Sequence, residues 1–187
     1  RRAPCLRAQR LHATQREPMA PWNPLDHVQV YFENRAFIDA VERAPVDGAI
    51  DLSIPGARSV RRTSTELKGA SDWYGLNYYT RWMVRSLTPD PHVARPGSER
   101  NDLGWEVWPE GFERALLSAS RRGLPILVTE DGFADAQDRL RPGAIVRFIE
   151  AMHRAIAGGA RVLGYLHWSL LDNFEGAGGY HGEFWLH

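Results

Sequence analysis

An acidic pair stands at the end of a strand-like run near the middle of the chain. The stretch LPILVTEDGFAD, residues 124–135, is apolar and β-branched as far as Thr129 and then presents Glu130 and Asp131 before Gly132. A carboxylate at the tip of a buried strand can serve as a nucleophile or as a general acid or base. It can equally be a helix cap or an ion-pair partner, and the side chain taken alone does not separate these readings.

Aromatic and amide residues occur at two other strand ends. SDWYGLNYYT, residues 71–80, carries Asn77, Tyr78 and Tyr79, and GYLHWSLLDNFE, residues 164–175, carries Trp168. Successive side chains of a strand point to opposite faces, so only one of Tyr78 and Tyr79 can face a site. Carboxylates among aromatic walls, with a few polar anchors, are the usual composition of a sugar-binding site.

The elements that would position these residues alternate between strands and helices. Apolar spacing predicts helices over 28–43, 109–122 and 144–157, and strands over 71–80, 124–129 and 162–169. Residues 44–69 are expected to form a loop with room for one short strand, and 81–103, broken by three prolines, a long surface loop. Strands that alternate with helices predict a parallel α/β sheet whose carboxyl ends share one edge, where barrels of this kind carry their chemistry.

Composition narrows the classes of partner. The chain has 187 residues, of which 23 are basic and 23 acidic, so no net field is expected to recruit nucleic acid or an anionic membrane. No apolar run approaches the roughly 20 residues that span a bilayer. The single cysteine, Cys5, excludes an internal disulfide framework and favours a reducing, cytoplasmic location.

The sequence lacks the common motifs for metal and nucleotide binding. There is no HExxH motif or Cys/His cluster, and no GxGxxG or GxxxxGK[ST] motif, so neither a metal nor a nucleotide cofactor is predicted.

Residues 1–20 are Arg-rich with little apolar periodicity. They are interpreted as a disordered leader, with a transit peptide as the alternative.

Four motifs together resemble those of glycoside hydrolase family 1. The stretches VTEDG, DWYGLNYYT, GWEVWPEGF and GYLHWSLLDNFE are similar to the family's ITENG, DFLGINYYT, GWEIYPEGL and GYFVWSLLDNFEW, in the same order. The resemblance covers residues 21–187. It implies the C-terminal part of a (β/α)8 TIM barrel, incomplete in this chain, with roughly its last three strands and the intervening helices.

The resemblance also implies residue roles. Glu130 corresponds to the family's catalytic nucleophile, and Tyr79 to the tyrosine that hydrogen-bonds it. The substrate-binding positions correspond to Asn77 close to the reacting sugar, Trp168 beneath the ring, Glu175 at the outer hydroxyls, and Trp105 towards the aglycone. A retaining glycosidase needs two carboxyl groups about 5–5.5 Å apart, one to attack the anomeric carbon and one to protonate the leaving oxygen.

The sequence departs from the family pattern in three places. No TFNEP-like motif is present, so the acid/base carboxylate is absent from this chain. Gly176 stands where the family has a sugar-binding tryptophan, and Asp131 replaces the asparagine of TENG. Asp131 is expected to point away from Glu130 on a βα loop, and His167 is expected to be a satisfied core histidine.

These observations predict a retaining β-glycosidase acting on a small β-glycoside or oligosaccharide through a glycosyl-enzyme intermediate on Glu130. The N-terminal half of the barrel is then expected from the parent protein. The alternative is a catalytically inactive sugar-binding fragment, or a truncated chain that does not fold by itself because a partial barrel exposes sheet edges and an apolar inner face.

Overall fold

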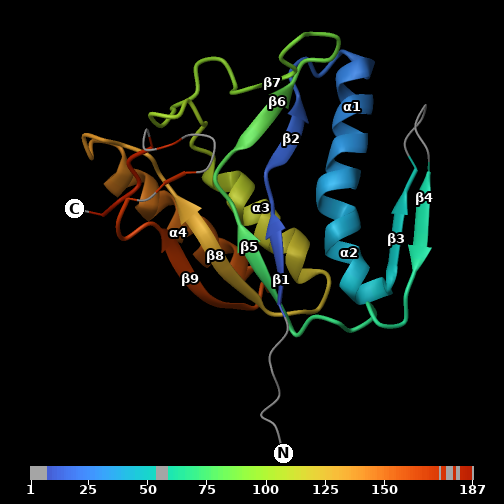
Figure 1. Cartoon of the computed structure of the whole chain (residues 1–187). Helices are drawn as coiled ribbons and strands as arrows, with labels where there is room; N and C mark the ends of the chain where they lie inside the picture. The colour runs from blue at the N-terminus through green and yellow to red at the C-terminus, as the bar shows by residue number, and fades with distance from the viewer. Residues whose placement is uncertain (1–7, 54–58, 173, 176–178, 180–181, 187) are drawn as a thin grey trace, which may run out of the picture.

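The centre of the molecule is a sheet of parallel strands. The computed structural model describes residues 8–53, 59–172, 174–175, 179 and 182–186. Four strands lie in the order β1-β5-β8-β9 (Figure 1), and each neighbouring pair is parallel. Their bounds are β1 Ala8–His12, β5 Trp73–Asn77, β8 Ile126–Gly132 and β9 Val162–Trp168. The predicted parallel sheet is confirmed, with one strand more than expected.

Two amphipathic helices cover one face of this sheet. Helix α3 (Pro109–Ser120) begins with a proline at its first turn, and α4 (Arg141–Ala157) runs into Gly158. Alternate residues of the strands, Tyr74, Leu76 and Tyr78 among them, pack against both helices in one buried cluster. The intervening positions of β5 therefore face the other side of the sheet, which would be the interior of a barrel.

A second helical layer lies beside β1 and β2 (Figure 1). Helix α1 (Pro24–Asn34), the π-helical segment η1 (Arg35–Asp39) and α2 (Ala40–Asp47) follow one another without a break. Asn23 caps the start by accepting from the Leu25 amide at 3.1 Å, and Gly48, with φ of 69°, ends the stretch. The predicted helix is confirmed and is longer than expected. The predicted loop after it contains a hairpin of two strands, β3 (Ala49–Leu52) and β4 (Val60–Thr63).

The prediction of a long loop over 81–103 is wrong at the start of that range. Residues Arg81–Val84 form β6, which pairs with β2 (Gln15–Pro18) and with β7 (His92–Val93). The prolines at 89 and 91 lie between β6 and β7, so they exclude a helix without excluding a hairpin. Arg81 is buried there because both oxygens of Glu106 accept from it, at 3.0 and 2.9 Å, and Glu17 pairs with it as well.

The leader predicted over 1–20 is also corrected from Ala8 onward. Strand β1 pairs with β5 over five positions, from Ala8 opposite Trp73 to His12 opposite Asn77. Backbone hydrogen bonds of this kind form whatever the side chains are, so a weakly apolar strand gives little sequence signal. Glu17 follows in β2 and is neutralised by Arg114 at 3.0 Å. Residues 1–7 lie outside the described part of the chain.

No helix among the described residues is long and apolar enough to cross a bilayer.

Candidate active site

The carboxylate and the tyrosine predicted to work together are in contact. The Tyr79 hydroxyl donates to Glu130 Oε2 at 2.9 Å. The backbone brings them together, because Asn77 of β5 is the ladder partner of Glu130 in β8 and the Tyr78 amide donates to the Glu130 carbonyl at 2.9 Å. Burial of the hydroxyl, and then its bond to Glu130, raises the pKa of Tyr79. Tyr79 therefore stays protonated and acts as a donor that fixes the orientation of the carboxylate.

The two tyrosines face opposite sides, as the strand period requires. Tyr78 is fully buried against the helices, and its hydroxyl donates to the Trp108 carbonyl at 3.0 Å. Gly111 permits this packing, since a Cβ at that position would lie 2.2 Å from the Tyr78 oxygen. As expected from the strand period, Tyr78 points into the core and Tyr79 points to the other side, where it contacts Glu130.

Asn77 is held by a residue that sequence reasoning missed. The Thr129 hydroxyl donates to Asn77 Oδ1 at 2.6 Å, which fixes the amide and directs its nitrogen elsewhere. That nitrogen, Nδ2, is buried and has no hydrogen-bond partner among the described residues. A buried amide donor of this kind can bind a ligand hydroxyl at little cost in desolvation. Thr129 lies one residue before Glu130, and its β-branched side chain indicates only a strand former from the sequence.

Trp168 and Glu175 also meet. The indole Nε1 donates to Glu175 Oε1 at 2.9 Å. Gly132 lies opposite Trp168 in the ladder, and a Cβ on it would be 2.0 Å from the Trp168 carbonyl oxygen. The end of the strand that carries Glu130 therefore touches the backbone that carries Trp168, and only glycine fits between them.

Trp105 and an unpredicted phenylalanine form an aromatic wall around Tyr79. The ring centroids of Tyr79 and Trp105 are 5.6 Å apart, and Phe184 lies 6.1 Å from Tyr79 and 6.2 Å from Trp105. Trp105, Glu175 and Phe184 also line a cavity of about 240 Å³. The predicted residues thus fall into two contacting pairs, Tyr79 with Glu130 and Trp168 with Glu175, with Trp105 packed on Tyr79.

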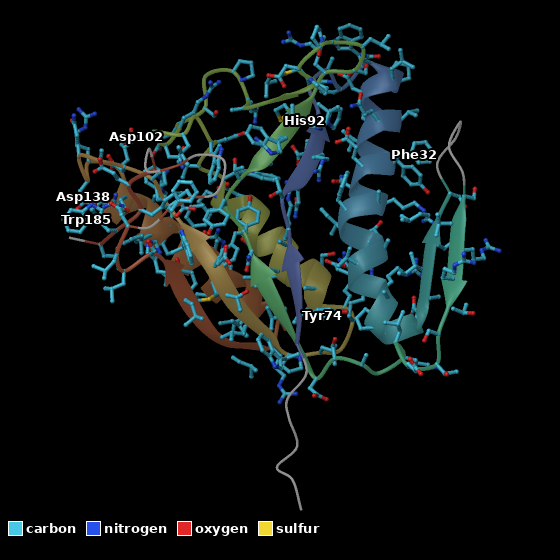
Figure 2. All side chains as sticks on the ribbon, viewed as in Figure 1. Phe32, Tyr74, His92, Asp102, Asp138 and Trp185 are labelled. Atoms are coloured by element: carbon cyan, nitrogen blue, oxygen red, sulfur yellow. The ribbon has the colours of Figure 1, made fainter. Side chains whose placement is uncertain are left out.

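Asp172 holds the segment that carries Phe184. Its Oδ1 accepts from the Phe184 amide at 2.8 Å and from the Trp185 amide at 3.1 Å. Trp185 lies at the same end of the molecule as Asp102 and Asp138, whereas Tyr74 lies at the opposite end of the sheet (Figure 2). The LLDN motif contains Asp172, but nothing in the sequence indicates its backbone partners.

Asp131 lies within β8 and not on a loop. Its side chain is buried and accepts from the Tyr165 hydroxyl at 2.8 Å. Burial raises the pKa of Asp131 to about 8, and the bond from Tyr165 opposes this only in part. His167 places Nδ1 3.0 Å from the same hydroxyl, while its buried Nε2 has no hydrogen-bond partner among the described residues. The prediction of a satisfied core histidine therefore holds for only one of the two ring nitrogens.

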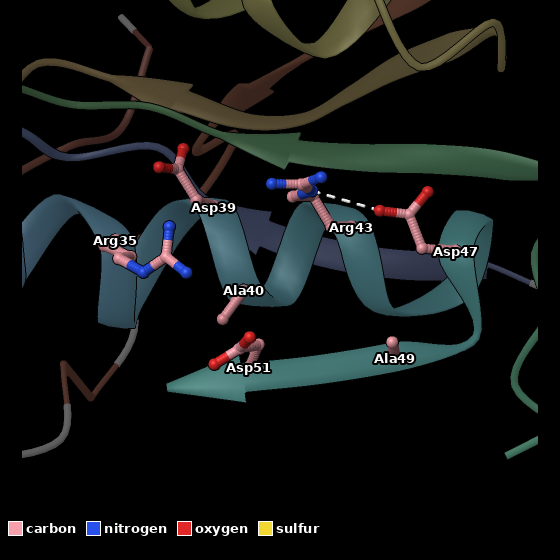
Figure 3. Close-up of a pocket in the computed structure, with 7 residues that line it drawn as sticks. All are labelled: Arg35, Asp39, Ala40, Arg43, Asp47, Ala49 and Asp51. Carbon is pink, nitrogen blue, oxygen red and sulfur yellow. Dashed lines mark hydrogen bonds and ion pairs between the residues drawn. The ribbon is translucent and has the colours of Figure 1, made fainter. Parts of the chain in front are cut away.

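A separate polar cavity lies between η1, α2 and β3 (Figure 3). It has a volume of about 230 Å³ and contains three aspartates and two arginines, with Arg43 and Asp47 paired at 3.0 Å. None of the predicted site residues lines it. Among the described residues no group of three or more His, Cys, Asp or Glu side chains could hold a metal ion. Gly176, the position of the missing tryptophan, lies outside the described residues.

Known proteins are similar to this chain in both sequence and fold. A β-galactosidase from Pyrococcus woesei is 34% identical over 178 residues, which cover 84% of this chain and 34% of that protein. A β-galactosidase from Saccharolobus solfataricus is 43% identical over 135 residues, covering 65% of this chain and 28% of that protein. The chain therefore spans about a third of the length of these relatives.

Solved structures give the same result for the fold. The β-glycosidase from Pyrococcus horikoshii, 28% identical, matches with a TM-score of 0.81 over 95% of this chain and 41% of that one. The β-glucosidase from Thermotoga maritima in complex with glucoimidazole, 26% identical, matches with a TM-score of 0.79 over 95% of this chain and 44% of that one. The fold is thus part of a (β/α)8 barrel, incomplete in this chain. The sequence profile of Glycosyl hydrolase family 1 matches residues 27–187, and the chain belongs to that family.

Proposed function

We propose that this chain carries the nucleophile side of a retaining β-glycosidase, with Glu130 as the nucleophile. The observation that carries the proposal is the bond from Tyr79 to Glu130 Oε2 at 2.9 Å, at the end of parallel strands where barrel enzymes hold their chemistry. A tyrosine donor fixes the orientation of the carboxylate, which a nucleophile requires.

The reaction follows from two carboxyl groups acting in sequence. A Glu130 oxygen attacks the anomeric carbon while the bond to the leaving oxygen breaks, and a second carboxylic acid gives that oxygen a proton. Water, deprotonated by the same second group, then releases the sugar from Glu130. This chain has no TFNEP-like motif, so the second group is assigned to the N-terminal half of the barrel in the parent protein.

The substrate proposed is a β-glycoside or a short oligosaccharide. Trp168 offers an aromatic face for the sugar ring, and the acceptor oxygens of Glu175 suit its outer hydroxyls. Asn77 Nδ2 is a buried donor for a further hydroxyl. Trp105, which lines a cavity together with Glu175, is assigned to the aglycone as part of the same proposal. Relatives named β-galactosidase and a β-glucosidase complex with glucoimidazole support a glucose- or galactose-type ring. The cytoplasmic location inferred from the single cysteine stays a prediction.

One observation favours a second candidate, a sugar-binding fragment without catalysis. The aromatic and hydroxyl-binding residues are in place, whereas the sequence lacks the acid/base motif. In that case the two contacting pairs would bind a sugar without breaking its glycosidic bond.

Labelling with 2,4-dinitrophenyl 2-deoxy-2-fluoro-β-glucoside separates the two candidates. Dinitrophenolate leaves without a proton, so attack by Glu130 needs no second carboxyl group, and the fluorine slows hydrolysis of the intermediate. We expect intact mass to show one fluoroglucosyl adduct, and peptide mapping to place it on the peptide that contains Glu130. A folded sample that binds the sugar without forming the adduct would support the sugar-binding fragment and contradict the proposal.

Tyr79→Phe should slow this labelling by roughly 10–100-fold, the usual cost of losing a hydrogen bond to a charged group. Without the hydroxyl the carboxylate loses its orienting donor and gains a hydrophobic edge. The rate of dinitrophenolate release, followed by absorbance, measures the effect. Tyr74→Phe is the matched control, since it removes a buried hydroxyl bonded to the Glu42 carbonyl at 2.5 Å, at the other end of the sheet. Equal slowing in both variants would contradict the role given to Tyr79.

A further inference from the structure

Three polar side chains, the first of which follows Glu130 in the chain, form a line across β8 and β9. The Tyr165 oxygen lies 2.8 Å from Asp131 Oδ2 and 3.0 Å from His167 Nδ1, so it stands between the carboxyl group and the imidazole. Asp131 is 1% exposed. At the two ends of the line, Asp131 Oδ1 and His167 Nε2 are buried and have no hydrogen-bond partner among the described residues. Neither the proposed reaction nor the sugar contacts use any of the three groups.

The line bridges the two strands that carry the proposed nucleophile and the sugar platform. Asp131 of β8 is the ladder partner of His167 in β9, and Gly132 is the partner of Trp168. The register of this pair shifts between Val128 and Asp131, which is the interval that contains Glu130. Where the backbone ladder is irregular, side-chain bonds are left to fix the relative position of the strand ends.

The hydrogen bonds admit two arrangements, because Tyr165 has one hydroxyl proton. If Asp131 is ionised, Tyr165 donates to it, and the tyrosine oxygen can then only accept from a proton on His167 Nδ1. If Asp131 is protonated, it donates to Tyr165, whose own proton then goes to an unprotonated Nδ1, so the imidazole proton sits on Nε2. Gain or loss of one proton at Asp131 therefore reverses both bonds and changes the tautomer of the imidazole.

Asp131 is the member of the line that titrates near neutral pH. Burial raises the pKa of the Tyr165 hydroxyl, as does the neighbouring Asp131, so the tyrosine keeps its proton. Burial, and then the charge of Arg141, lowers the pKa of His167 from its ordinary 6.5, which favours the neutral imidazole. Burial raises the pKa of Asp131 to about 8. The other titratable groups around the line are Tyr78 and Tyr79 at the end of β5, Glu130 beside Asp131, and Arg141 on α4.

We propose that Asp131, Tyr165 and His167 form one hydrogen-bonded chain that positions Glu130 against Trp168, and that loss of the proton from Asp131 reverses the direction of this chain. The positioning role rests on the function proposed above, whereas the reversal does not. The three residues are positioning residues, since none of them contacts the reacting atoms.

Nitrogen NMR of the histidine rings tests the reversal without any substrate. We expect His167 to carry its proton on Nε2 at about pH 6 and on Nδ1 at about pH 10, with the change centred near pH 8. The signals are assigned by their disappearance in His167→Gln. Asp131→Asn and Tyr165→Phe should each abolish the change while the protein stays folded. A wild-type His167 that keeps one tautomer over the whole range, or a change that persists in Asp131→Asn, would overturn the proposal.

Labelling by the fluoroglucoside tests the positioning. In Tyr165→Phe the maximal labelling rate should fall about tenfold while the half-saturating reagent concentration stays the same, because binding groups are untouched and only the orientation of Glu130 is lost. Tyr74→Phe is again the matched control. In the wild type the maximal labelling rate should change with pH over the same range as the His167 tautomer. In Asp131→Asn the rate should show no pH-dependent change over that range.

The two proposals fail in different ways. If the wild-type chain is not labelled at all, the proposed function fails and the NMR result still decides the reversal. If the wild type is labelled and Tyr165→Phe matches it at every pH, the positioning role is wrong and the proposed function stands.

Discussion

Asparagine in place of Asp131 should raise the free energy of unfolding, and by more at pH 8 than at pH 5. Burial raises the pKa of the folded-state carboxyl from an ordinary 3.8 to about 8. Between these values the folded chain holds a proton that the unfolded chain releases, so stability is present at low pH and is lost as the pH rises. Each pH unit above the unfolded-state pKa costs up to about 1.4 kcal/mol of unfolding free energy, so the loss at pH 8 is at most about 5 kcal/mol. Asparagine removes it and can still accept from Tyr165.

Urea unfolding of both proteins across this pH range measures the difference. Asp135→Asn is a control of opposite sign on the same segment, because Asp135 accepts from the amides of Leu140 at 2.6 Å and Arg141 at 3.0 Å. Burial raises the pKa of Asp135, but these backbone bonds together lower it by a larger amount, so the net shift is downward. The ionised carboxylate therefore stabilises the fold at neutral pH. If the wild type and Asp131→Asn lose or gain stability in parallel from pH 5 to pH 8, the buried-acid interpretation of Asp131 is wrong.

Glu130→Gln should abolish labelling by the fluoroglucoside, with a fall in rate of at least about 10³-fold. The amide oxygen can still accept from Tyr79, so the local hydrogen bond survives, but a neutral amide does not attack the anomeric carbon. The measurement is the rate of dinitrophenolate release together with intact mass after long incubation. The variant should unfold at a similar urea concentration to the wild type, which shows that the loss is chemical.

Glu175→Gln is the comparison for this experiment. It changes the other carboxylate of the site, whose Oε1 accepts from Trp168 Nε1 at 2.9 Å, and the amide oxygen can replace that contact. We expect this variant to form the adduct on Glu130 at a higher half-saturating concentration, because binding of the outer hydroxyls is weakened. An adduct on Glu175 in the wild type, or full labelling of Glu130→Gln, would show that the nucleophile has been misassigned.

The central architecture is predictable because its signals are local. The alternation of apolar runs marks β5, β8 and β9 and helices α3 and α4, and parallel strands necessarily bring their carboxyl ends together. That rule alone predicts that Asn77, Tyr79 and Glu130 share one edge of the sheet. The resemblance of the four motifs to those of glycoside hydrolase family 1 then favours a sugar site over a helix cap or an ion pair as the role of Glu130.

The parts that sequence reasoning misses depend on partners distant in sequence. Strand β1 is weakly apolar and exists because β5 offers backbone groups 65 residues away, from Ala8 to Trp73. Arginine at position 81 is a residue type typical of loops, and its burial depends on the ion pair with Glu106. Phe184 joins the aromatic wall only because Asp172 binds the backbone of its segment. Neither residue pattern nor spacing encodes such pairings, since each is decided by packing.

The contact that Asp172 makes with residues 184 and 185 affects how freely the length of the intervening segment can vary in this family. One carboxylate oxygen closes the base of the segment between Asp172 and Phe184. Lengthening a closed loop costs little, about 0.6 kcal/mol for each doubling of its length. Insertions or deletions between Asp172 and Phe184 can therefore accumulate while Phe184 keeps its place beside Tyr79. The contacts of Phe184 with Tyr79 and Trp105 are then independent of the length of that segment.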